Sequence, residues 1–267
     1  MDVFLVPDDF PTIRAAIEAI ANPTTIVIAP GHYAESLRVV DKPYVVLQSA
    51  RLSRRGVTIS GSDGDAVLSV ERSTIHLSGI EIRSNGQRRG IAVAGGSISL
   101  QECVIAGNRS TTPGAAMNCR DARARIQKSM LAGNTVDCDS ASLTGGGALY
   151  LQNCDVEIAG ASIQANAVYS PTAARGGGIW AEGGRMRMWR SRVTDNALYA
   201  PSASGGGIYF AQTERAQLGG SVITGNNGGG VFIDGERDRV VIHANTVVRQ
   251  NHPDDLSRPE TFGLLER

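Results

Sequence analysis

A unit of 23 to 32 residues repeats through most of this chain, and it constrains the fold more than any other feature. Each unit begins with a glycine-rich run, as in GGGIWAE at Gly176 and GGGIYFA at Gly205. Each unit ends with an aliphatic or β-branched residue, two spacers and an asparagine. These asparagines are Asn85, Asn108, Asn134, Asn166, Asn196, Asn226 and Asn251. Their variable spacing indicates a fixed core with a loop of changing length.

Each unit contains three short stretches in which apolar and polar residues alternate, without helical periodicity. One unit cannot bury its apolar face alone, so successive units must stack as coils. The strands would pair in parallel with those of the next coil, about 4.8 Å away. We therefore expect an all-β, single-stranded parallel β-helix with three parallel sheets. Because asparagine tolerates left-handed turns and bonds to its equivalent in the next coil, the seven asparagines are predicted to form an inward-pointing ladder.

The open ends of such a solenoid need covers. The segment PTIRAAIEAI places three isoleucines on one helical face, which predicts a short N-terminal capping helix. We expect a single domain over residues 1–267. Its N-terminal cap and first coil occupy residues 1–36, and a C-terminal capping tail occupies residues 252–267.

Several segments resemble the pectin lyase-like superfamily. The opening TIRAAIEAI, followed by TIVIAPGHYAESLRV, is similar to the N-terminal cap and first coil of these proteins. The later GGGI and IxxN units are similar to right-handed β-helix repeats. The resemblance extends from Val3 to Asn251 and implies a right-handed parallel β-helix. It implies no single activity, since the same coils carry lyases, hydrolases, epimerases, esterases, adhesins and inert spacers.

The active-site motifs of the polysaccharide-modifying members are missing. The sequence lacks the complete polygalacturonase set, the WxDH element of pectate lyases, the QDT segment of pectinesterases and the epimerase DPHE motif. No active site is therefore assigned by resemblance, and whether the protein is an enzyme stays open.

Composition limits the partners. The 26 basic and 26 acidic residues balance, and no basic run offers nucleic acid an electrostatic footprint. No apolar stretch is long enough for membrane insertion. We expect no metal or cofactor, because the histidines and cysteines lack metal-ligand spacing. The compartment stays open: secreted or cell-surface if a signal peptide was removed, and cytoplasmic otherwise.

The four cysteines lie in the central third of the chain. We interpret them as isolated thiols in core or turn positions. The alternative is a bridge between Cys119 and Cys154, which would join neighbouring coils. The four are Cys103, Cys119, Cys138 and Cys154.

Aromatic residues gather in one column of the first strands. If the aliphatic residues of these strands point inward, as Ile179 would, the alternate residues point outward. The first outward column then contains Tyr150, Trp180, Tyr209 and Phe232. The second contains Arg120, Gln152, Glu182 and Asp234. Rings flanked by polar groups suit the faces and rims of sugars, so these residues are predicted to bind a polysaccharide or oligosaccharide.

Two alternatives apply to the aromatic column. The rings could simply stabilise adjacent strands. They could also be buried in a homo-oligomer formed through the aromatic face.

The loops between each asparagine and the next glycine run should stand beside this column. Two of them, AVYSPTA and ALYAPSA, are near copies that place Tyr169 over Tyr199. Both tyrosines are therefore predicted to wall a groove along the first sheet and to contribute to substrate binding.

Glu182 and Asp234 are the catalytic candidates. They stand two coils apart in one column, about 9.6 Å at the backbone. This separation is close to the roughly 6.5–9.5 Å between the carboxyls of an inverting glycosidase. The sequence thus predicts a polysaccharide-binding β-helix, which would be a lyase or inverting hydrolase if it is catalytic. The alternative is a structural or assembly module without a small-molecule ligand.

Overall fold

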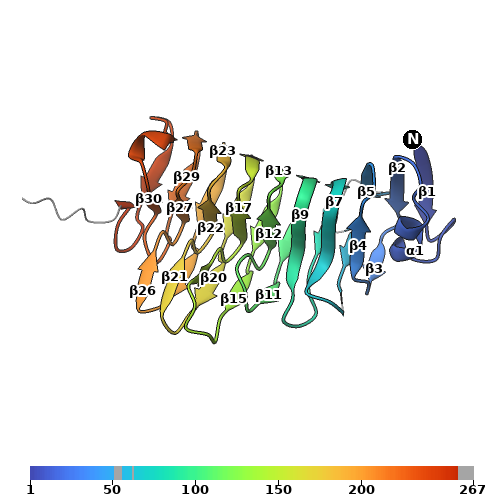
Figure 1. Cartoon of the computed structure of the whole chain (residues 1–267), viewed down its shortest axis with the longest axis horizontal. Helices are drawn as coiled ribbons and strands as arrows, with labels where there is room; N and C mark the ends of the chain where they lie inside the picture. Colours follow the sequence, from blue (N-terminus) through green and yellow to red (C-terminus); the bar gives the residue numbers. More distant parts are fainter. Residues whose placement is uncertain (51–55, 62, 258–267) are drawn as a thin grey trace, which may run out of the picture.

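Almost the whole chain is wound into stacked coils in the computed structural model, which describes residues 1–50, 56–61 and 63–257 (Figure 1). The wall of each coil contains up to three strands, and each of these pairs in parallel with its equivalents in neighbouring coils. The parallel β-helix predicted from the repeat is confirmed.

The first and second strands of the coils belong to one 17-stranded sheet, because the long strands β7 (Ala66–Ser78) and β9 (Arg89–Gln101) contribute to both rows. The other first strands are β4 (Leu37–Val40), β12 (Met117–Arg120), β17 (Leu149–Gln152), β22 (Ile179–Glu182), β27 (Ile208–Ala211), β30 (Val231–Asp234) and β33 (Leu256–Ser257). The other second strands are β1 (Asp2–Val6), β2 (Thr24–Ile28), β5 (Val45–Ser49), β13 (Arg123–Gln127), β18 (Asp155–Ala159), β23 (Arg185–Trp189), β28 (Arg215–Gly219) and β31 (Val240–Ile242).

The third strands form a separate nine-stranded sheet. They are β3 (Gly31–Tyr33), β6 (Val57–Ile59), β8 (Ile80–Ile82), β10 (Val104–Ala106), β14 (Met130–Ala132), β19 (Ser162–Gln164), β24 (Arg192–Thr194), β29 (Val222–Thr224) and β32 (Val247–Arg249).

The loops that follow the asparagines are themselves strand-rich, which the repeat pattern did not predict. A four-stranded sheet contains β11 (Arg109–Ser110), β15 (Thr135–Asp137), β20 (Ala167–Tyr169) and β25 (Ala197–Tyr199). A three-stranded sheet contains β16 (Thr144–Gly145), β21 (Ala173–Arg175) and β26 (Ser202–Ser204). Both lie along one side of the solenoid, at the bottom of Figure 1.

Inward-facing side chains form one apolar core along the solenoid. Leu149, Ile179 and Ile208 are direct neighbours in successive coils, because each coil repeats the same alternation. The residues predicted to point inward from the first strands are all fully buried, namely Ile91, Leu149, Ile179, Ile208 and Val231.

The N-terminal cap is the helix α1 (Ile13–Glu18), as the isoleucine spacing predicted. Thr12 begins it, since its side-chain oxygen accepts a hydrogen bond from the Ala15 backbone nitrogen at 3.0 Å. Ile13 and Ile17 are buried against the core and close the first coil. Most of the predicted C-terminal capping tail, from residue 258 onwards, lies outside the described residues.

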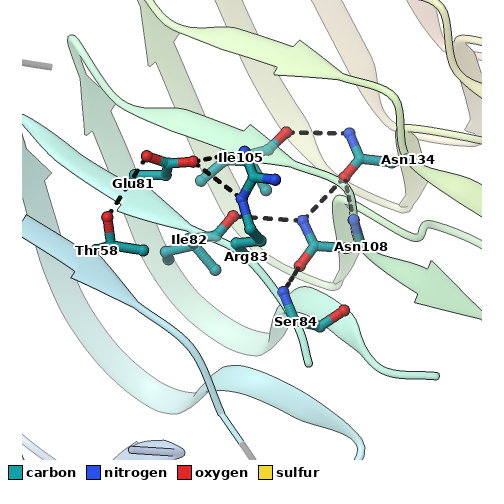
Figure 2. Close-up of polar contacts among 8 residues, drawn as sticks. All are labelled: Thr58, Glu81, Ile82, Arg83, Ser84, Ile105, Asn108 and Asn134. Carbon is teal, nitrogen blue, oxygen red and sulfur yellow. Dashed lines mark hydrogen bonds and ion pairs between the residues drawn. The ribbon is translucent and has the colours of Figure 1, made fainter. Parts of the chain in front are cut away.

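Six asparagines form a buried ladder at the corner after the third strands. From the second member onwards, each side-chain oxygen accepts hydrogen bonds from the backbone and side-chain nitrogens of the asparagine one coil earlier, at 2.8–3.1 Å. Figure 2 shows the start of the ladder, where Asn108 Nδ2 donates to Asn134 Oδ1 and Asn134 Nδ2 donates to the Ile105 carbonyl. The members are Asn108, Asn134, Asn166, Asn196, Asn226 and Asn251.

Asn85 lies outside this ladder, so the prediction of seven members is wrong. The buried Ser84 occupies the position instead, and its backbone nitrogen donates to Asn108 Oδ1 at 2.8 Å (Figure 2). Asn85 is exposed and donates to Ser60 Oγ. In this coil the repeat pattern therefore places the ladder position one residue too late, at Asn85 instead of Ser84.

Candidate functional site

The aromatic column that was predicted to be open to solvent is buried. Tyr150, Trp180 and Tyr209 are only 6–7% exposed and form a separate apolar cluster outside the main core. The rings are in register as predicted: Trp180 lies 4.9 Å from Tyr150 and 6.3 Å from Tyr209, edge to face. Phe232 ends the column, partly exposed and stacked on Tyr209 at 5.2 Å.

The chain's own loops cover these rings. A Cβ atom on Gly145 in β16 would lie 2.8 Å from Trp180 Cε3, so only glycine allows the loop backbone to approach the indole this closely. The guanidinium of Arg175 in β21 lies 5.5 Å from the centre of the Tyr209 ring. The loops fold back over the first strands instead of standing beside them. The three inner rings therefore expose little surface, and the prediction of an open aromatic ladder is wrong for them. Binding of a sugar or of a second subunit at this face stays a prediction.

The second outward column forms the rim of this covered region. Tyr150 donates a hydrogen bond to Glu182 at 2.8 Å, and Tyr209 donates to Asp234 at 2.6 Å. Burial, together with the acceptor carboxylate, raises the pKa of Tyr150, and the same causes raise that of Tyr209 to about 12. Both carboxylates thus serve to satisfy buried phenols, and their role as an acid–base pair stays a prediction.

The remaining rim residues, Arg120 and Gln152, lie in the two coils before Glu182. Arg120 is exposed, with its guanidinium 5.8 Å from the centre of the Tyr150 ring. Gln152 is partly exposed and is the register partner of both Arg120 and Glu182.

Tyr169 and Tyr199 form an exposed pair on the outer side of the loop sheet. Their rings stack at 4.6 Å with an interplanar angle of 12°, and they are 43% and 49% exposed. Val168 and Leu198 alternate with them and are buried in the small core beneath the loops. The two tyrosines therefore face away from the covered rings.

The outer face of the second strands carries the features expected of an extended binding surface. One outward column passes through five neighbouring strands. Its first four side chains are polar and its fifth is an alanine: Gln48, Ser78, Gln101, Gln127 and Ala159. All five are partly exposed. The next residue of the column is Trp189, the register partner of Ala159. This column was not among the predicted site residues, although the strand alternation could have revealed it.

Trp189 lies in a hollow of about 730 Å³ that Gln101, Gln127 and Asn245 also line. A side chain at position 219, the next place in the column, would overlap the six-membered ring of the indole. Gly219 therefore makes room for Trp189, and His243 packs against the indole at 5.1 Å. The ring is held in place while part of it stays open to solvent.

Two further hollows lie on the same face, of about 550 and 520 Å³. They share Thr74, Ser97, Arg123 and Asp155, and the larger one shares Gln127 with the tryptophan hollow. Because neighbouring hollows share lining residues, they form one shallow groove across the second strands. A chain-like ligand could occupy it over several coils.

Charged and titratable groups line the larger of these two hollows. Arg125 forms an ion pair with Glu157 at 2.9 Å. Arg123 and Arg187 make no ion pair with any described residue, so their guanidinium groups are available to ligand oxygens. Burial lowers the pKa of His76, which favours its neutral form.

A fourth hollow, of about 600 Å³, lies between α1 and the first strands. Two positively charged side chains that line it already have partners within the chain. Arg14 pairs with Asp63 at 3.5 Å, and Lys42 donates to the Ile20 carbonyl at 2.8 Å. This hollow is consequently less suited to a ligand than the groove that holds Trp189.

The described residues contain no cluster of three histidine, cysteine or acidic side chains that could hold a metal ion. No helix within the described ranges is long and apolar enough to cross a membrane.

The stacked coils, the parallel pairing and the asparagine ladder define a parallel β-helix protein. Residues 55–247 match the model of the family described as "right handed beta helix region". The chain belongs to this family, which establishes the right-handed winding implied by the resemblance. No curated protein matches the sequence.

Solved structures of pectin lyase-like proteins share the fold. Pectate lyase Pel9A is 12% identical with a TM-score of 0.63, and the match covers 95% of this chain and 80% of that one. Pectin methylesterase PemA from Erwinia chrysanthemi is 12% identical with a TM-score of 0.45, over 94% and 92% of the two chains. Pectin methylesterase from carrot is 11% identical with a TM-score of 0.45, over 97% and 83%. At these identities the likeness concerns the fold alone.

Proposed function

We propose that this protein binds an extended polysaccharide along the outer face of its second strands, with Trp189 as the stacking platform. The observation that carries the proposal is the preformed tryptophan hollow at the end of a row of amide and hydroxyl side chains. An indole packs against the apolar face of a sugar ring, while amides bind its hydroxyls. The row repeats at the strand spacing of about 4.8 Å, so equivalent groups recur along the groove.

A polysaccharide suits this surface better than other extended ligands. The groove is shallow and mixes arginines with carboxylates, whereas a nucleic-acid site requires a basic surface. It contains a single indole among polar groups, whereas the centre of a stable protein interface is usually apolar. The pectate lyase whose fold is similar acts, by its name, on a polysaccharide, and this supports the same class of ligand here.

Binding, rather than cleavage, is the function that this face supports. The carboxylates predicted to be catalytic, Glu182 and Asp234, belong to the first strands and not to the groove with Trp189. If the protein is a lyase or inverting hydrolase through these residues, Glu182→Gln would abolish the release of new reducing or unsaturated ends. The same variant would leave retention on polysaccharide unchanged.

The proposal is tested with Trp189→Ala and affinity electrophoresis in gels containing polygalacturonan or a neutral polysaccharide. Loss of the main aromatic contact should weaken binding by about 30-fold, the equivalent of 2 kcal/mol. Gly219→Val should weaken it comparably while keeping the indole, because the new side chain displaces the ring. Tyr199→Ala, which removes an exposed ring from the loop sheet, is the matched control and should bind normally.

Two outcomes would contradict the proposal. Unchanged retention of Trp189→Ala, together with weakened retention of Tyr199→Ala, would move the site to the loop tyrosines. If the unmodified protein is retained by none of the polysaccharides, the assembly hypothesis gains support. Sedimentation of the purified chain would then test that hypothesis directly.

A further inference from the structure

Two of the four cysteines meet in the core between neighbouring coils. Cys119 lies in β12, and Cys154 follows the turn after β17, which is the strand paired with β12. Their sulfur atoms are 3.1 Å apart, and both side chains are buried. In the structure both are free thiols.

The other cysteines have different surroundings. Cys103 Sγ lies 3.4 Å from the carbonyl oxygens of Leu77 and Gln101. Cys138 Sγ lies 3.2 Å from the hydroxyl of Ser140. Only the pair of Cys119 and Cys154, among the described residues, is therefore placed for sulfur–sulfur chemistry.

We propose that Cys119 and Cys154 form an inter-coil disulfide by exchange with a low-molecular-weight disulfide such as oxidised glutathione. The sulfurs need to approach by about 1 Å to reach the bonding distance of about 2.05 Å. The two cysteines sit on adjacent coils that the parallel sheet already holds together. The cross-link therefore requires only a small shift of side chains.

The exchange proceeds in two balanced steps. The hydrogen-bond contact between the sulfurs raises the pKa of the Cys119 thiol and lowers that of Cys154, so Cys154 ionises first. Its thiolate attacks one sulfur of glutathione disulfide and releases one glutathione thiolate. Cys119 then attacks Cys154 in the mixed disulfide, loses its proton to solvent and releases the second glutathione. Two protein thiols are oxidised, and one glutathione disulfide is reduced to two thiols.

The cross-link would stabilise the solenoid at its longest loop. It joins residues 35 positions apart, and the closed segment includes the loop strands β15 and β16. Restricting a segment of this length in the unfolded chain should raise the melting temperature by about 5–15 °C. Because the pair is buried, both its oxidation by glutathione disulfide and its reduction by reductants in solution require local opening of the coils and should be slow.

Peptide mapping of the full chain tests this proposal. Trypsin places Cys119 in peptide 110–120, but it leaves Cys138 and Cys154 together in peptide 129–175. The experiment therefore uses the Cys138→Ser variant, incubated with oxidised glutathione and alkylated under non-reducing conditions. We expect a linked pair of these two peptides and a higher melting temperature, both reversed by dithiothreitol. Cys119→Ala in the same background should abolish both effects.

Two results would overturn the proposal. One is recovery of both peptides as separately alkylated species after oxidation. The other is a stable glutathione adduct on Cys154 without transfer to Cys119. Circular dichroism of the Cys119→Ala variant shows whether it is folded. If it is not, Cys154→Ser provides the comparison, because either variant removes the pair.

Discussion

Replacing Asn166 by alanine would test how much the asparagine ladder contributes to stability. Asn166 is fully buried in the middle of the ladder. Its Oδ1 accepts hydrogen bonds from the backbone nitrogen and Nδ2 of Asn134, at 3.0 and 2.9 Å. Its Nδ2 donates to the Leu131 carbonyl at 3.1 Å and to Asn196 Oδ1 at 2.8 Å.

The expected loss follows from the groups left without partners. In Asn166→Ala the Asn134 backbone nitrogen, one hydrogen of the Asn134 amide and the Leu131 carbonyl each lose a bond in a buried site. Each unsatisfied buried group costs about 1–3 kcal/mol. Asn196 Oδ1 loses one donor but keeps the Asn166 backbone nitrogen. We therefore expect the free energy of unfolding to fall by about 3–9 kcal/mol for the three groups together, a large fraction of a typical domain's stability.

Urea denaturation followed by circular dichroism measures this difference. Asn85→Ala is the matched control, because that asparagine ends the same sequence pattern but is exposed. It should change the free energy of unfolding by less than about 0.5 kcal/mol. If Asn166→Ala lost less than about 1 kcal/mol, or no more than Asn85→Ala, the ladder would not be a main source of stability.

Two further predictions concern packing and pH. Ile179→Ala should lower the free energy of unfolding by about 2–5 kcal/mol through lost burial and a residual cavity, measured in urea; a loss below about 0.5 kcal/mol would contradict the core assignment. The raised pKa of Tyr209, about 12 against an ordinary value of about 10, means that the folded state holds this proton more tightly. The stabilisation that this raised pKa of Tyr209 gives the folded state is fully present below pH ~10 and is lost as the pH rises towards about 12. Tyr209→Phe should therefore show a smaller loss of stability over that range in thermal unfolding, and an unchanged pH profile would refute this.

The fold was predictable because the repeat determines it locally. Alternation within each short strand decides which residues face inward, and stacking of equal units places like residues in register. Ile179 and its neighbours, the capping helix and six of the seven ladder asparagines follow from this rule. Asn85 does not, since a one-residue slip between two polar residues, Ser84 and Asn85, changes no hydrophobic position.

The accessibility of the outer faces was decided only by tertiary structure. Strand alternation correctly predicted that Tyr150, Trp180 and Tyr209 face away from the main core, but it does not predict which segments cover them. The loops fold back over these rings because they can form small parallel sheets with the loops of adjacent coils, and such pairing joins residues about 30 positions apart. The same long-range stacking leaves Trp189 in an open groove and brings Cys119 to Cys154. Sequence alone determined the direction of each side chain, because direction depends on neighbours in the strand. Burial depends on segments that meet only after the coils have stacked.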